Sequence, residues 1–221
     1  MARMLRLYQY CGTLVLALVT AVAGLAAAWP ALVRLPGDEL VPSVLRFQPL
    51  SPAEIERFET SRRLGSASDQ KQMGRLRLGQ ALVTSDPVLA VHLLDEAIGR
   101  LEQGLSAAPA DTAAWAALAF ARLRRSGPGD ASLSALRLSI SMAPAEATLV
   151  VWRVGLLLAH ESLLGADDRQ LLAQQIRAGW IFAPVQLVAL LRQHGHLSLL
   201  HDQLTPPDLG QLARLLATPL P

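Results

Sequence analysis

The pattern of apolar and polar positions divides the chain into one long apolar segment and a series of shorter periodic segments. Within residues 87–105 the apolar side chains recur at spacings of three and four, at Val91, Leu94, Ala97, Ile98, Leu101 and Leu105. This spacing places them on one face of an α-helix. No segment shows the alternation and hairpin turns that are typical of β-strands. The pattern therefore predicts an all-α domain.

The long apolar segment lies at the N-terminus. The 27 residues 7–33 carry no charge and are bounded by Arg6 and Arg34. About 20 apolar residues in a helix cross a hydrocarbon core of roughly 30 Å. We therefore expect residues 1–10 to be an N-terminal tail and residues 11–33 to be a transmembrane helix.

The charges around this segment predict its orientation. Arg3 and Arg6 favour a cytoplasmic N-terminus by the positive-inside rule, although Arg34 and Arg46 on the other side oppose it. We expect a single-pass protein of a bacterial inner membrane, with its domain in the periplasm. The alternative is a cleaved signal peptide with Ala26–Ala28 as its cleavage site, but the apolar run is longer than such signals use.

The rest of the chain is predicted to be a linker, residues 34–50, and a helical domain, residues 51–217. Prolines and Gly37 crowd the linker, and Ser51-Pro52 then gives a helix start with a capping residue and proline at the first position. The further helices are expected at about 68–83, from 87 onward, 145–160, 167–182, 184–193, 197–204 and 207–217.

An internal repeat is the most informative feature of the domain. The segment Ser106–Asp111 (SAAPAD) recurs as Ser141–Glu146 (SMAPAE) at a period of 35, and a weaker third copy ends at Pro184. Proline cannot continue a helix, and the residue before it is pushed out of the α region. Each Ala-Pro pair is therefore predicted to end one helix and to open the next, which gives stacked helical hairpins.

This repeat resembles the tetratricopeptide repeat family. The matching residues are Trp115, Leu118, Ala119, Ala131 and Pro144, and the resemblance covers residues 88–160. Arg122 departs from the pattern, because it stands where that family has an aromatic residue. The resemblance implies an array of helical hairpins that binds other proteins.

The composition excludes several other classes. Hydrophobic residues make up 52% of the chain and charged residues 17%, which is too apolar for a disordered protein. The net charge is only +2, and the nearest approach to a basic stripe is Arg122, Arg124 and Arg125, so we expect no nucleic-acid partner. The single cysteine, Cys11, excludes an intramolecular disulfide.

The candidate chemistry is sparse. The histidines are His92, His160, His194, His196 and His201. A metal site at His194-Gly195-His196 is one interpretation; the other, which we favour, is a helix end, with glycine just past the last turn. The serines 132, 134, 139 and 141 have no marked partner, and no nucleophile elbow, P-loop or zinc-protease motif is present. We predict no catalytic, cofactor or metal site, and no enzyme.

Taken together, these patterns predict a membrane-anchored scaffold or adaptor protein. Its layout is similar to small inner-membrane proteins that accompany bacterial polysaccharide synthesis and export. The alternative is an accessory subunit of a larger membrane complex, whose span packs against partner helices.

Overall fold

The computed structural model describes the backbone of residues 2–217 and the side chains of residues 19, 20 and 22–217. Every regular element in this part of the chain is a helix, which confirms the prediction of an all-α protein. The elements are α1 (Ala2–Asp38), α2 (Val41–Leu45), α3 (Pro52–Ser61), α4 (Ala67–Val83), α5 (Pro87–Ala107), α6 (Thr112–Ser126), α7 (Asp130–Met142), α8 (Val150–Ala159), the 3-10 helix η1 (Glu161–Leu163), α9 (Ala166–Phe182), α10 (Pro184–Gln193), α11 (Leu197–His201) and α12 (Pro206–Ala217).

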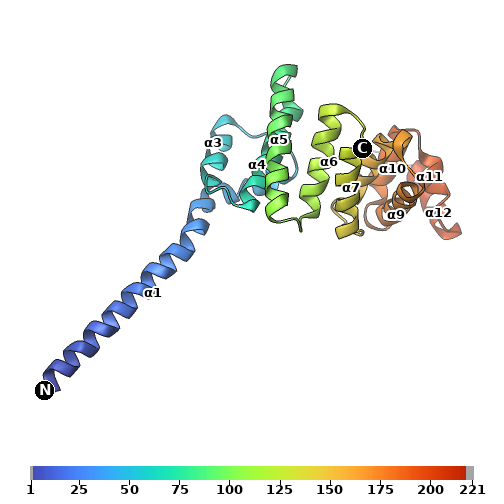
Figure 1. Ribbon diagram of the computed structural model, residues 1–221. Coiled ribbons are helices and arrows are strands. Elements are labelled where there is room, and N and C mark those ends of the chain that lie inside the picture. The colour runs from blue at the N-terminus through green and yellow to red at the C-terminus, as the bar shows by residue number, and fades with distance from the viewer. Residues whose placement is uncertain (1, 218–221) are drawn as a thin grey trace.

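Figure 1 shows α1 leaving the body of the molecule as a straight rod, whereas the later helices stand beside one another in a row. Consecutive helices pack in adjacent pairs, notably α4 with α5, α6 with α7 and α8 with α9. Side-chain contacts show that α5 and α6 run antiparallel. Arg125 near the end of α6 binds Asp95 in the first half of α5, while Trp115 near the start of α6 donates to Pro109 O just after α5.

The repeated Ala-Pro pairs have one backbone geometry. Ala108, Ala143 and Ala183 end their helices with φ of −147°, −150° and −150° and ψ of 85°, 82° and 57°. These values lie outside the α region, which a following proline disfavours for the residue before it. The chain therefore leaves the helix at each pair, as the sequence repeat predicts.

A buried arginine joins the helices around the second of these turns. The side chain of Arg153, on α8, is fully buried and donates from Nη1 to Ala143 O at 2.7 Å, and from Nη2 to Ser139 O at 2.7 Å. These carbonyls belong to the end of α7, where a helix has no backbone donors left for its last carbonyls. Ser139 Oγ accepts from Arg153 Nε and donates to Thr112 O at the start of α6. Burial lowers the pKa of Arg153 to about 10.

Close approach of helices is made possible by small residues. The α6 side chains Ala114, Ala116, Ala117, Ala119 and Ala121 are all buried, as expected for a helix with neighbours on several sides. On α5, a Cβ at Gly104 would lie 2.5 Å from Lys71 Cγ and 2.8 Å from Ala67 O of α4. The α4–α5 pair therefore requires glycine at this position.

The segment 34–50, predicted from the sequence to be a linker, packs on the domain. It holds the last turn of α1, which continues through Pro36, and all of α2. Leu40 and Val44 are buried in a second small core, which is completed by Phe58, Met73 and Leu76. The segment is ordered because its apolar side chains are covered by α3 and α4.

One expectation about a helix start differs from the structure. Residues 145–149 form turns, and α8 begins only at Val150. The N-cap of α7 is Gly129, and Asp130 is the first residue of the helix. An acid in the first turn still complements the helix dipole.

No helix, judged on the residues that the structure describes, is long and apolar enough to be a membrane span. Much of the segment expected to span, residues 11–33, lies outside the described side chains, which leave out residues 1–18 and 21.

Candidate functional site

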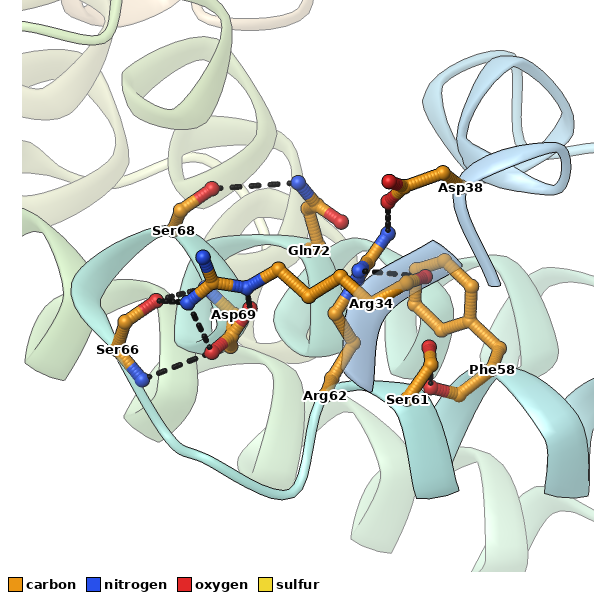
Figure 2. A network of polar contacts seen from close by, with 9 residues as sticks. All are labelled: Arg34, Asp38, Phe58, Ser61, Arg62, Ser66, Ser68, Asp69 and Gln72. Carbon is orange, nitrogen blue, oxygen red and sulfur yellow. Dashed lines mark hydrogen bonds and ion pairs between the residues drawn. The ribbon is translucent and has the colours of Figure 1, made fainter. Parts of the chain in front are cut away.

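A network of polar contacts lies where α1 meets the domain. Ser66 caps α4, and Asp69, three residues later, accepts a hydrogen bond from the Ser66 backbone N–H at 3.0 Å. Arg34 of α1 donates from Nε and Nη2 to the two Asp69 carboxylate oxygens at 2.9 and 3.0 Å, and from Nη2 to Ser66 Oγ at 2.8 Å (Figure 2). The Asp69 carboxylate thus both belongs to the cap of α4 and binds Arg34 of α1.

The environment of Asp69 favours its charged form. Burial raises the pKa of this carboxyl, but the hydrogen bonds from Arg34 and Ser66 outweigh burial, so the pKa lies below its usual range. The side chain of Asp69 is only 1% exposed, against 28% for Arg34. A bidentate pair with one buried partner is among the stronger side-chain contacts in proteins.

A second arginine binds the end of α1 from the other side. Arg62, at the C-terminal end of α3, donates from Nη2 to Asp38 at 2.6 Å and from Nη1 to Arg34 O at 3.5 Å (Figure 2). Its guanidinium also lies 5.0 Å from the centre of the Phe58 ring. These contacts use both the backbone and the acidic end of α1, so α1 is fixed to α3 as well as to α4.

Tight packing removes the remaining freedom of this junction. Gly37 of α1 lies so close to α3 that a Cβ there would overlap Ser61 Oγ. Ser61 is buried and donates to Phe58 O. The junction formed by Arg34, Asp38, Arg62 and Asp69 therefore fixes the orientation of α1 relative to the domain.

Further along the array, other acids at the start of a helix also pair with basic residues of another helix. Asp111, the N-cap of α6, pairs with Lys71 at 3.1 Å and Arg75 at 3.0 Å, both on α4. Asp168, in the first turn of α9, accepts two hydrogen bonds of 2.7 Å from Arg137 on α7. Burial raises the pKa of Asp111 but its basic partners outweigh it, and for Asp168 the Arg137 hydrogen bonds dominate, so both pKa values are lowered.

Two grooves lie on the domain near this junction. An apolar groove of about 310 Å³ runs between α2, α4 and α5, with Phe47, Leu50, Val83 and Leu89 among its walls. A second groove, of about 450 Å³, lies between α1 and α3; it is lined by Leu32, Val33, Pro36, Ala53, Glu56, Arg57, Thr60, Ser61 and Arg63. We call them the α4–α5 groove and the α1–α3 groove.

His194 lies at the C-cap of α10, His196 at the N-cap of α11 and His201 at the end of α11. Gly195, with φ of 75°, follows the end of α10, which confirms the helix stop at His194. His196 Nε2 faces Glu161 at 3.6 Å. Among the described residues, no group of three histidines, cysteines or acids is placed to hold a metal ion.

The sequence did not predict one polar pair, that of Ser132 and His160. Ser132 Oγ lies 2.5 Å from His160 Nε2, and His160 Nδ1 lies 2.7 Å from Leu156 O. Both side chains are buried, so the pair joins α7 to the end of α8 and is closed to a substrate. The two residues are 28 positions apart, and no local pattern marks them as partners.

The junction was also missed, although a part of it had a sequence signal. A serine three residues before an acid, as in Ser66 and Asp69, is the signature of a capping box. Nothing in the sequence marks Arg34 as the partner of that acid.

No protein-family model matches the chain, and searches of curated proteins and of solved structures found no match.

Proposed function

We propose that the chain is a scaffold or adaptor protein of a bacterial inner membrane, anchored by α1 and binding a protein partner through its helical array. The observation that carries this proposal is the uncovered apolar side of α1. Val22, Leu25, Trp29 and Leu32 are 50–64% exposed on this helix. Exposed apolar side chains in such a row are stable when a bilayer covers them.

The junction supports the anchoring part of the proposal. A domain that hangs from a flexible linker samples many orientations, whereas Arg34 and Arg62 fix this domain to the end of α1. A fixed attachment holds one side of the array towards the membrane. It also raises the concentration of the domain near other membrane proteins.

The array supports the scaffold part. Its antiparallel helices and its Ala-Pro turns agree with the resemblance to tetratricopeptide repeats, whose arrays offer extended surfaces to partners. The α4–α5 groove is lined mainly by apolar side chains, and Val88, which precedes its wall residue Leu89 in the sequence, is 78% exposed. We propose that it binds an apolar segment of a protein partner. A link to polysaccharide synthesis or export stays a prediction from the layout alone.

The anchoring is tested by extraction of bacterial membranes with alkaline carbonate. We expect the wild-type chain to stay in the membrane and the variant V22D/L25D to be released, because each aspartate opposes insertion into hydrocarbon. The control V88D/V91D carries the same chemical change on exposed residues of α5 and stays in the membrane. Release of the wild-type chain contradicts the anchor.

The scaffold role is tested by a photocrosslinking amino acid placed at Val88 in the membrane-bound chain. We expect one discrete crosslinked protein, which is lost when Val83 on the groove wall becomes aspartate. The same probe at Arg124, an exposed residue at the end of α6, gives no such product. Equal labelling from both positions contradicts a specific docking groove.

An accessory subunit is the second candidate, because partner helices also cover an exposed apolar stripe. Replacement of residues 11–33 by a polyleucine span separates the two functions. The scaffold keeps the crosslink from Val88 after the replacement, whereas the accessory subunit loses it.

A further inference from the structure

The α1–α3 groove combines two kinds of wall. Leu32, Val33 and Pro36 of α1 form an apolar side, and Arg57 and Arg63 stand on the side of α3. The apolar side continues the exposed stripe of α1 towards the domain. The groove therefore lies where an apolar helix passes into a polar environment.

The arginine side chains of the groove are accessible to a ligand. Arg63 is exposed and forms no ion pair with any residue that the structure describes. Arg57 pairs with Glu39 at 2.7 Å, but the two side chains are 44% and 63% exposed, so water competes with this contact. Glu56 is the one carboxylate among the groove residues. Arg57 faces the Glu39 carboxylate, so the exposed guanidinium of Arg63, which has no such pair among the described residues, is the group that favours an anionic ligand.

We infer that the α1–α3 groove binds the headgroup of an anionic phospholipid. The inference rests on the proposed membrane anchoring, which places Leu32 and Val33 at the end of the span, level with the lipid headgroups. The phosphate contacts Arg63 and Arg57, and the upper part of an acyl chain lies along Leu32 and Val33. A free phosphate ion gains nothing from contact with the apolar side chains of Leu32 and Val33, whereas a phospholipid contacts both sides of the groove. We therefore take a phospholipid as the source of the phosphate.

The binding of this lipid stabilises the folded domain, because a ligand that binds the native state alone shifts the unfolding equilibrium. Anionic lipids attract arginines close to the bilayer surface over distances of about one Debye length.

The experiment uses the full chain in nanodiscs of phosphatidylcholine, alone or in equal parts with phosphatidylglycerol, and measures the unfolding temperature by circular dichroism. We expect phosphatidylglycerol to raise the unfolding temperature of the wild-type chain by roughly 4 °C. The variant R63Q, which leaves the Arg57–Glu39 pair in place, loses most of this rise. The control R124Q, an exposed arginine far from the groove, keeps it.

Each outcome has a distinct meaning. A wild-type chain that enters nanodiscs and shows no rise, or a rise that R63Q keeps in full, overturns the lipid site and leaves the anchor standing. Equal losses in R63Q and R124Q also overturn it, since they indicate general charge attraction. A chain that does not enter nanodiscs overturns the proposed anchoring and the lipid site together.

Discussion

Arg34 and Asp69 are 35 positions apart in the chain, yet their side chains form a bidentate pair of 2.9 and 3.0 Å. Asp69 is also the acid of the capping box that begins α4. The direction of α1 and the start of α4 therefore depend on one carboxylate. This pairing makes the junction the part of the molecule whose disruption has the clearest consequences.

Asp69→Asn is expected to lower the stability of the domain. The change removes the charge that Arg34 faces and weakens the capping box, with a loss of about 2 kcal/mol. For a domain of this size the unfolding temperature falls by roughly 4–8 °C, measured by circular dichroism in mild detergent. The control Arg57→Gln removes an exposed pair and changes the unfolding temperature little.

The effect of Asp69→Asn depends on pH in a defined direction. The pKa of Asp69 is lower in the folded than in the unfolded chain, so the folded state holds fewer protons. The stabilisation is therefore complete above the unfolded pKa and is lost as pH falls through the folded pKa. The difference in unfolding temperature between the wild type and Asp69→Asn is full at neutral pH and closes below about pH 4. A difference that grows on acidification contradicts the assignment.

The stable unit is expected to begin before the end of α1. A fragment 45–221 lacks Arg34, Leu40 and Val44, and so loses the junction and part of the second core. We expect it to unfold at a lower temperature than a fragment 30–221, which keeps them. Equal unfolding temperatures of the two fragments are the result that contradicts this prediction.

Two glycines of α5 are expected to respond to alanine in opposite directions. A Cβ at Gly104 would lie 2.5 Å from Lys71 Cγ, so Gly104→Ala overpacks the α4–α5 contact and costs about 1–3 kcal/mol. A Cβ at Gly99 has no neighbour within 4 Å, so Gly99→Ala gains about 0.5–1 kcal/mol from helix propensity. Urea unfolding of the two variants measures both changes. Similar losses in both would indicate that packing of α4 on α5 is not the cause.

Arg153→Ala is expected to be among the most destabilising single changes. It leaves the carbonyls of Ser139 and Ala143 without their donor and opens a cavity, at a cost of about 3 kcal/mol. Arg153→Lys keeps the charge but lacks the planar fork, so it retains only part of the stability. The exposed Arg124→Ala serves as the control. The measurement is urea unfolding, and a loss no greater than that of Arg124→Ala contradicts a structural role.

The local signals of the sequence located most of the helices. The capping residues Ser51 and Asp86 start helices where proline follows them, and α10 has the bounds expected for it. The start of α8 was misplaced, because the turns at 145–149 carry no glycine or second proline to mark them. Helix propensity alone extends the helix back to the preceding proline.

The contacts that make up the junction had no such signals. Arg34 looks like the flank of an apolar segment, and Asp38 like a charge in a linker. Their partners Asp69 and Arg62 come from other helices, and the approach of α1 to α3 depends on Gly37 and Ser61. The pair of Ser132 and His160 is equally non-local.

By itself the sequence determined the all-α class and the positions where the chain turns, since Ala108, Ala143 and Ala183 each precede a proline whose ring restricts their backbone directly. Only the tertiary structure decided which arginine meets which acid. Backbone sterics act between neighbouring residues, whereas an ion pair across 35 positions forms only after the helices that carry it have packed.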